Sequence, residues 1–204
     1  AWILLALGLW LNGRLFPIYL QSFGGELRSA LGALLGQGTL FWALMAILPP
    51  LLTMRMVAEE ARSGVLEFLL TAPVSDGAVV LGKLFASMTF FALLWLSAPL
   101  YGAVLALSGA PVDFPQLLLA YLGALLLSGL FSAIGLFASA LTATPTLSAF
   151  LAFVLSLAFL VAPGLIQQQA WLDPEWAREL ALKVDVIGRY SRSFLSGVFD
   201  SGHV

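Results

Sequence analysis

Charged side chains that could bind a partner or carry chemistry gather in one internal stretch of this sequence, Arg55 to Lys83. If that stretch is helical, one face is polar and the opposite face is apolar. The polar face holds residues at steps of three and four, namely Glu60, Ser63, Gly64, Glu67 and Thr71. Pro73 would end such a helix, and Ser75 with Asp76 can cap the next one.

The pattern predicts a short amphipathic helix lying in the membrane interface and joined at both ends to spanning helices. Arg55 can pair with Glu59, and Glu59 with Arg62, each pair contributing about 0.2–0.5 kcal/mol. Two interpretations remain open on the pattern alone. The stretch is either a solvated loop helix or a lever that moves the two spanning helices when a partner pushes its polar face.

A nucleotide site within this chain is not expected. Gly77 to Leu84 resembles a phosphate-binding P-loop, but Leu84 stands where that motif needs Ser or Thr after the lysine, and no strand precedes it. The sequence has no cysteine, and its one histidine is His203, next to the last residue. We therefore expect no metal, no cofactor and no catalytic site on this chain.

A second pattern is a stripe of small and hydroxyl residues at steps of four, three, four and three. Its members are Ser128, Ser132, Gly135, Ser139 and Thr142. The stripe could line a polar path for cargo, or it could let helices pack closely through small side chains. We favour packing.

Composition indicates the solvent of the elements that carry these residues. The chain has 204 residues, of which 61% are hydrophobic and 10% charged, with a net charge of −2. Soluble domains average roughly 45–50% apolar and about 25% charged residues. The sequence therefore predicts an integral membrane protein whose solvent is the lipid bilayer, and its charge gives no reason to expect nucleic acid.

Apolar runs long enough to cross a bilayer, about 20 residues each, predict five spanning segments. They cover residues 1–20, 36–57, 79–108, 115–141 and 146–166. Residues 58–78 form the charged segment, and residues 167–204 are amphipathic and predict one or two short surface helices. The first run has no charged residues before it, so we read a spanning helix and expect further residues upstream.

The run from Leu51 to Asp76, followed by Val80-Leu81-Gly82-Lys83, resembles the signature of ABC type-2 permeases. It is most similar to the branch of gliding-motility and nitrous-oxide-reductase-maturation permeases. The resemblance continues more loosely through Leu136 to Thr142 and Ser196 to Asp200. It implies an all-α polytopic bundle with an interfacial coupling helix, and it implies six spanning helices, so a sixth is expected beyond the five found here.

The resemblance also implies partners. It places segment 58–78 in the cytoplasm, where a separate ABC ATPase subunit would dock and hold ATP and magnesium. The residues implied at that interface are Glu59, Glu60, Arg62, Gly64, Glu67, Pro73, Asp76 and Lys83. A second permease subunit, identical or related, and a bacterial inner membrane are implied as well.

The basic residues of the 167–204 segment, which are Arg178, Lys183, Arg189 and Arg192, outnumber the three between Arg55 and Lys83. Counting positive charges alone would therefore make 167–204 cytoplasmic. We give the resemblance precedence and expect that segment on the opposite side. The expected function is the permease of an ATP-driven exporter. The alternative is a membrane subunit that transmits force to an outer protein without moving cargo.

Overall fold

The computed structural model describes residues 2–64, 75–168, 179, 183 and 185–195, and these residues are helical with short connections. Five stretches are long and apolar enough to cross a membrane: Trp2–Ser22, Leu27–Glu60, Asp76–Leu107, Phe114–Leu141 and Pro145–Ile166. The predicted all-α fold with five spanning segments is therefore confirmed.

The first spanning stretch is helix α1 (Trp2–Ser22). The second begins nine residues earlier than the sequence predicted, because residues 27–35 are helical as well. It comprises α2 (Leu27–Gly32), a π-helical turn η1 (Ala33–Gln37) and α3 (Thr39–Thr53), which runs on through Pro49 and Pro50. Gly36 interrupts it with φ 139°, a backbone conformation that residues other than glycine rarely adopt.

The third spanning stretch is divided into α6 (Asp76–Trp95) and α7 (Ser97–Leu107), with Leu96 between them. Pro99 has no N–H to donate to the carbonyl of Trp95, which explains the break. The Asn12 side chain of α1, only 2% exposed, donates to Ser97 Oγ at this point over 3.1 Å. That bond fixes how α1 faces the break.

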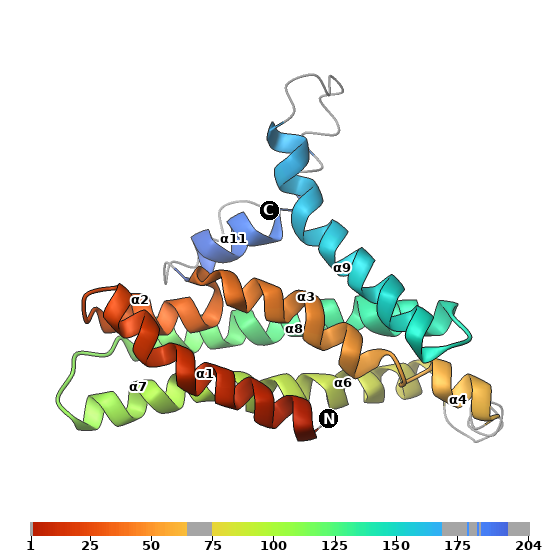
Figure 1. The fold of residues 1–204 in the computed structure, drawn as a ribbon, viewed down its shortest axis with the longest axis horizontal. Helices are drawn as coiled ribbons and strands as arrows, with labels where there is room; N and C mark the ends of the chain where they lie inside the picture. The colour runs from red at the N-terminus through yellow and green to blue at the C-terminus, as the bar shows by residue number, and fades with distance from the viewer. Residues whose placement is uncertain (1, 65–74, 169–178, 180–182, 184, 196–204) are drawn as a thin grey trace.

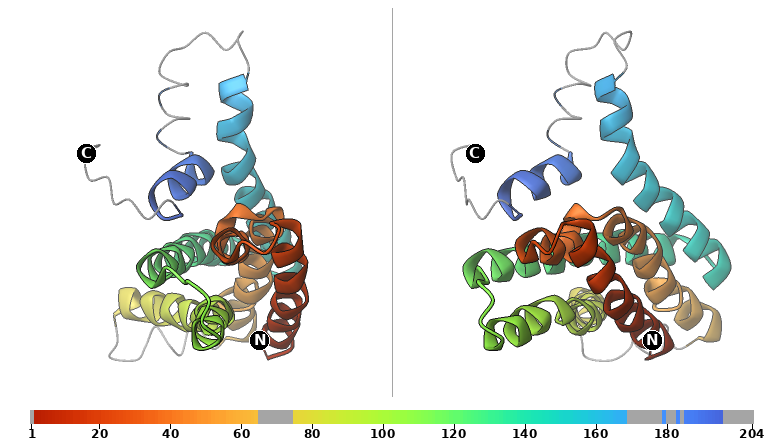
Figure 2. Two further views of the ribbon diagram at one scale, coloured as in Figure 1. Left: turned by 90° about the vertical axis from the view of Figure 1, so that its left-hand side faces the viewer. Right: turned by 60° about the vertical axis from the view of Figure 1, so that its left-hand side comes forward.

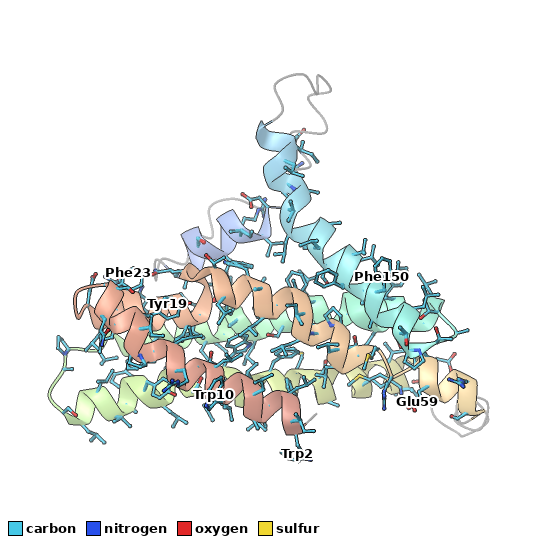
Figure 3. All side chains as sticks on the ribbon, in the orientation of Figure 1. Trp2, Trp10, Tyr19, Phe23, Glu59 and Phe150 are labelled. Atoms are coloured by element: carbon cyan, nitrogen blue, oxygen red, sulfur yellow. The ribbon has the colours of Figure 1, made fainter. Side chains whose placement is uncertain are left out.

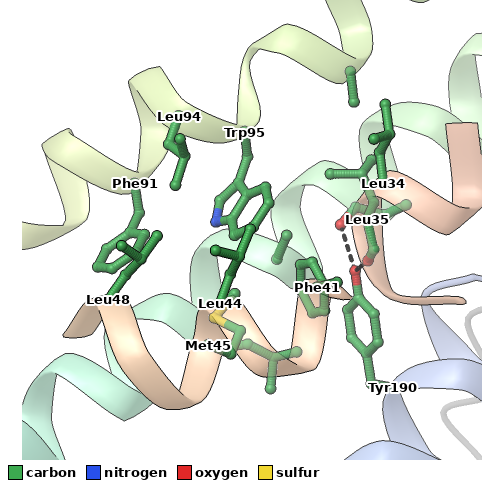
Figure 4. Packing of buried hydrophobic residues seen from close by; sticks show 14 of the residues in the cluster. Leu34, Leu35, Phe41, Leu44, Met45, Leu48, Phe91, Leu94, Trp95 and Tyr190 are labelled. Atoms are coloured by element: carbon green, nitrogen blue, oxygen red, sulfur yellow. Dashed lines mark hydrogen bonds between the residues drawn. The ribbon is translucent and has the colours of Figure 1, made fainter. Parts of the chain in front are cut away.

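The centre of the bundle is α8 (Phe114–Leu141), which packs against α3, α6, α7 and α9. Its neighbours supply large aromatic side chains to one continuous apolar core. Phe41 of α3 meets Trp95 of α6 at 4.9 Å between ring centroids (Figure 4). Trp95 Nε1 donates to Ser128 Oγ of α8 over 3.0 Å. Aromatic contacts and a satisfied indole thus join three helices.

Helix α9 (Pro145–Gln168) starts beside the end of α8 and then runs away from the bundle, as the views in Figures 1 and 2 agree. Half of the residues in the most apolar stretch of α8 are buried, against 17% for α1 and 22% for α9. The side chains of these two helices, including Trp2, Trp10 and Phe150, mostly point outward (Figure 3). Their apolar faces are suited to lipid or to another membrane helix.

A short helix, α11 (Val186–Ser193), docks onto η1 through Tyr190. The Tyr190 hydroxyl donates to the Leu35 carbonyl and lies 3.0 Å from the Ala120 carbonyl, and its ring stacks on Phe41 (Figure 4). Burial raises the pKa of Tyr190, so the hydroxyl keeps its proton and continues to donate. The predicted short helix in segment 167–204 is present here. Residues 169–178, 180–182, 184 and 196–204 lie outside the described part.

We expect Tyr190→Phe to detach α11 while leaving its aromatic packing possible. The hydroxyl has one proton to donate, so a net contribution of about 0.5–1.5 kcal/mol per hydrogen bond predicts a loss of that size. Thermal unfolding of the purified protein in detergent measures this. The control is Tyr101→Phe, since Tyr101 stacks on Phe16 at 4.8 Å without a hydroxyl bond among the described residues. Equal shifts for both variants would contradict the assignment.

Candidate functional site

The charged stretch lies at one end of the bundle, which we call the α4 end. Here α3 and α8 end, and α6 and α9 begin, around the helix α4 (Ala58–Ser63). Glu59 and Glu60 occupy the first turn of α4 and Arg62 its last turn, an arrangement that complements the helix dipole. Figure 3 shows Glu59 at this end of the molecule.

Helix α4 is shorter than the sequence predicted. It ends at Ser63 because Gly64 adopts a left-handed conformation, with φ 77° and ψ −3°. The polar face that the sequence drew from Glu60 through Gly64 to Thr71 is therefore not one unbroken helical face. Glu67 and Pro73, expected at the same interface, lie outside the described residues. Ser75 does cap the next helix, since its side chain accepts from the Ala78 N–H.

An ion pair ties α4 to α6. Lys83 Nζ lies 2.5 Å from Glu60 Oε1, and it also donates to the Met56 carbonyl in the turn before α4. The Lys83 side chain is 15% exposed and that of Glu60 30%. The sequence placed both residues at a partner's interface. The structure turns them toward each other, so that they hold α4 in place, and contact of either residue with a partner stays a prediction.

A serine hydroxyl ties α4 to α8. Ser139, which is 1% exposed, accepts from the N–H groups of Ala58 at 3.0 Å and Val57 at 3.2 Å, and it donates to the Met54 carbonyl at 3.3 Å. It therefore satisfies N–H groups at the start of α4 that no helical carbonyl can reach. Sequence reasoning missed this role, because 81 residues separate Ser139 from Ala58 and no motif links them.

The remaining charged residues of this end face outward. Arg55 pairs with Glu59 at 3.7 Å, as predicted, but both side chains are more than half exposed, so the pair contributes about 0–1 kcal/mol. Among the described residues, Glu59 and Arg62 form no ion pair, so that prediction was wrong. Arg62, Gly64 and Asp76 are exposed. These outward residues, together with Glu59, form a surface that a partner could contact.

The small-residue stripe packs helices together for most of its length. Gly135 allows α3 to approach so closely that a Cβ built there would lie 2.1 Å from Thr53 Oγ1. Ser128 Oγ accepts a hydrogen bond from the Trp95 indole. The Thr142 hydroxyl donates to the Ala138 carbonyl of its own helix at 3.0 Å. Ser132 is buried but its hydroxyl has no partner. Contacts with other helices are therefore seen at three of the five positions, Ser128, Gly135 and Ser139.

Two cavities in the described part of the chain could hold a ligand. A groove of about 320 Å³ between α6 and α8 has apolar walls apart from Lys83, whose ammonium is already engaged. A cavity of about 120 Å³ near α2 carries Arg28, Asp113 and Gln116 at its wall. There Arg28 donates to Gln116 and pairs with Asp113 at 3.6 Å. The polar side chains at both cavities already have partners within the chain. The α4 end is therefore the better candidate for a functional site.

Comparison with known proteins identifies one family. Residues 14–178, most of the chain, match the family model described as ABC-2 family transporter protein. The matched range contains all five spanning stretches at least in part, together with the whole α4 end. No curated protein and no solved structure matches the chain.

Proposed function

Because this chain belongs to the ABC-2 family of transporter proteins, we propose that it is the permease subunit of an ATP-driven exporter in a bacterial inner membrane. In this proposal the α4 end faces the cytoplasm and receives an ABC ATPase subunit, which holds ATP and magnesium. A second permease subunit, identical or related, covers part of the apolar surface of α1 and α9. The proposal also assigns the chain to the branch of gliding-motility and nitrous-oxide-reductase-maturation permeases, on the resemblance of its charged segment.

One observation carries the proposal: α4 is exposed on one side and fixed on the other. Its outward surface offers Glu59, Arg62 and Gly64, while Glu60 and its N-terminal N–H groups are tied to α6 and α8. A helix held in this way transmits displacement, because a push on α4 cannot be absorbed without moving α6 and α8.

The energy for that movement comes from the partner. When ATP binding draws two ATPase subunits together, each subunit shifts the α4 segment that it touches. The bundle then adopts whichever arrangement makes better contacts with the closed ATPase pair. This is rigid-body switching of packed helices, in which the ATP contacts supply the difference in free energy.

Gly64→Val tests whether a partner contacts this surface. Gly64 is exposed, and a Cβ at its position meets nothing within 4 Å, so the variant alters the surface and strains one residue with positive φ. We expect at least a tenfold loss of the ATPase subunit that copurifies with the chain. Each 1.4 kcal/mol of lost binding corresponds to one such factor.

The matched control is Gly109→Val at the opposite end of the bundle. Gly109 has φ 84°, close to the 77° of Gly64, and is likewise open within 4 Å. Both variants therefore carry similar backbone strain, and only Gly64→Val should release the ATPase. Equal retention of the ATPase by both would contradict the proposed interface.

In reconstituted complex, cargo-stimulated ATPase activity with flux supports an exporter, whereas activity that responds only to an outer protein supports a force-transmitting subunit.

A further inference from the structure

Three buried hydroxyls on α8 and α9 have no hydrogen-bond partner among the described residues, and we call them the hydroxyl seam: Ser132, Ser148 and Ser156. Each is 0% exposed. The described residues include nine buried polar side chains in all, and the other six each make a hydrogen bond. A buried polar group without a partner is uncommon in native proteins and calls for a physical reason.

These hydroxyls lie on two helices, α8 and α9, that pack against each other and also against α3. Phe131 and Phe159 bring the two antiparallel helices together at 6.3 Å between ring centroids, and Ser132 and Ser156 are one and three residues from them. Ser148, Ala152 and Ser156 follow one another at steps of four, so they share one face of α9. The fourth unpartnered buried atom, Glu60 Oε2, belongs to α4, which contacts both α8 and α9.

Phe131 and Phe159 pack across this interface, so apolar contacts stabilise its closed state. The serines of the seam add little surface for dispersion contacts. No hydrophobic force holds helices together inside a bilayer, so packing and hydrogen bonds must do so. The seam contributes no hydrogen bonds, and water would satisfy its hydroxyls if the helices parted.

The position of α9 gives such a motion a pivot. The helix begins next to α4, keeps Phe159 in contact with Phe131 of α8, and runs away from the bundle toward its far end (Figures 1 and 2). A displacement of α4 therefore acts at the base of a helix whose far end is not enclosed by the bundle.

We propose that the α8–α9 interface opens during the transport cycle and that water enters and hydrates the hydroxyl seam. This inference rests on the proposed function, since α4 must be moved by a partner. It adds the place at which the bundle opens, which is a path lined by hydroxyl groups within a single chain.

Single cysteines test the opening, because the chain has no cysteine of its own. Ser132→Cys, Ser148→Cys and Ser156→Cys are made in the complex with its ATPase, in membranes, and treated with a small, water-soluble thiol reagent. We expect labelling to rise at least fivefold when ATP is added. The control is Ser128→Cys, one turn away on α8, whose hydroxyl accepts from Trp95, and its labelling should not change.

Absence of labelling at all three positions with and without ATP would overturn the inference. So would labelling that ATP does not alter, or labelling of Ser128→Cys in parallel. Copurification and ATPase activity measured on the same samples separate the two proposals. A complex that hydrolyses ATP normally but keeps the seam closed overturns the opening alone, whereas loss of the complex in the parent chain overturns the proposed function.

Alanine substitutions test whether removal of each hydroxyl raises or lowers the Tm. Ser132→Ala and Ser156→Ala each remove a hydroxyl that has no partner, so we expect the Tm to rise by about 2–4 °C and ATP turnover to slow as the closed state gains stability. Ser128→Ala leaves the Trp95 indole unpaired and should lower the Tm. If Ser132→Ala lowers the Tm as Ser128→Ala does, the Ser132 hydroxyl is bonded and the inference is wrong.

Discussion

Glu60→Lys should abolish the stimulation of the ATPase subunit by this chain while leaving membrane insertion intact. The substitution places a second ammonium group beside Lys83, whose Nζ now lies 2.5 Å from Glu60 Oε1. A hydrogen bond to a charged group contributes about 1.5–3 kcal/mol, which corresponds to a shift of roughly 10- to 150-fold in the equilibrium that keeps α4 docked. The ratio of ATPase activity with and without this chain measures the loss.

Exchanging the two charges separates the ion pair from the individual residues. The double variant Glu60→Lys with Lys83→Glu restores opposite charges at the same place, so it should recover most of the stimulation. Glu26→Lys, an exposed acid at the far end of the bundle, should leave stimulation unchanged. A double variant as inactive as Glu60→Lys alone would show that Glu60 acts by touching the partner and not through Lys83.

The second large effect is expected from Ser139→Ala, which removes the hydroxyl without adding bulk at this buried position. The N–H groups of Val57 and Ala58 would lose their acceptor, and the Met54 carbonyl its donor. Unpaired buried groups cost about 1–3 kcal/mol each. We therefore expect the start of α4 to unwind and hydrogen exchange at these two amides to accelerate at least tenfold.

Thr142→Ala is the matched control for that experiment, on the same helix and one turn further along. The Thr142 hydroxyl bonds only to the Ala138 carbonyl of its own helix, at 3.0 Å, so its removal should not change exchange at α4. Unchanged exchange in Ser139→Ala would mean that the turn before α4 is held by other contacts, and Lys83, which donates to the Met56 carbonyl, is the nearest candidate.

Periodicity and composition were sufficient to predict the spanning helices, since the bilayer requires long apolar runs and the sequence contains five. They missed Leu27 to Gly32, since the apolar run predicted that the second spanning segment begins only at residue 36. The segment is nevertheless helical because the adjoining η1 and the helices α1, α7 and α8 pack against it. Tertiary contacts of this kind override local propensity.

The sequence predicted where the candidate site lies, but not the contacts between its residues. The charge pattern and the family resemblance both pointed to residues 58–78, yet neither could show that Glu60 and Lys83 face each other or that Ser139 caps α4. Those contacts join residues 23 to 81 positions apart, and they depend on how α6 and α8 are placed beside α3. The same limit applies to the hydroxyl stripe, in which Ser128 and Ser132 look alike in sequence and differ only in what surrounds them.

The hydrogen bond from Asn12 to Ser97 has a consequence for how the protein is made. The two residues are 85 positions apart, and at about 5–20 residues per second the ribosome needs about 4–17 s to cover that distance. During this interval α1 must wait in the bilayer with an amide that has no permanent partner. Replacing Asn12 by leucine should therefore make early insertion of α1 more efficient, yet leave the finished protein without the contact that sets the rotation of this helix.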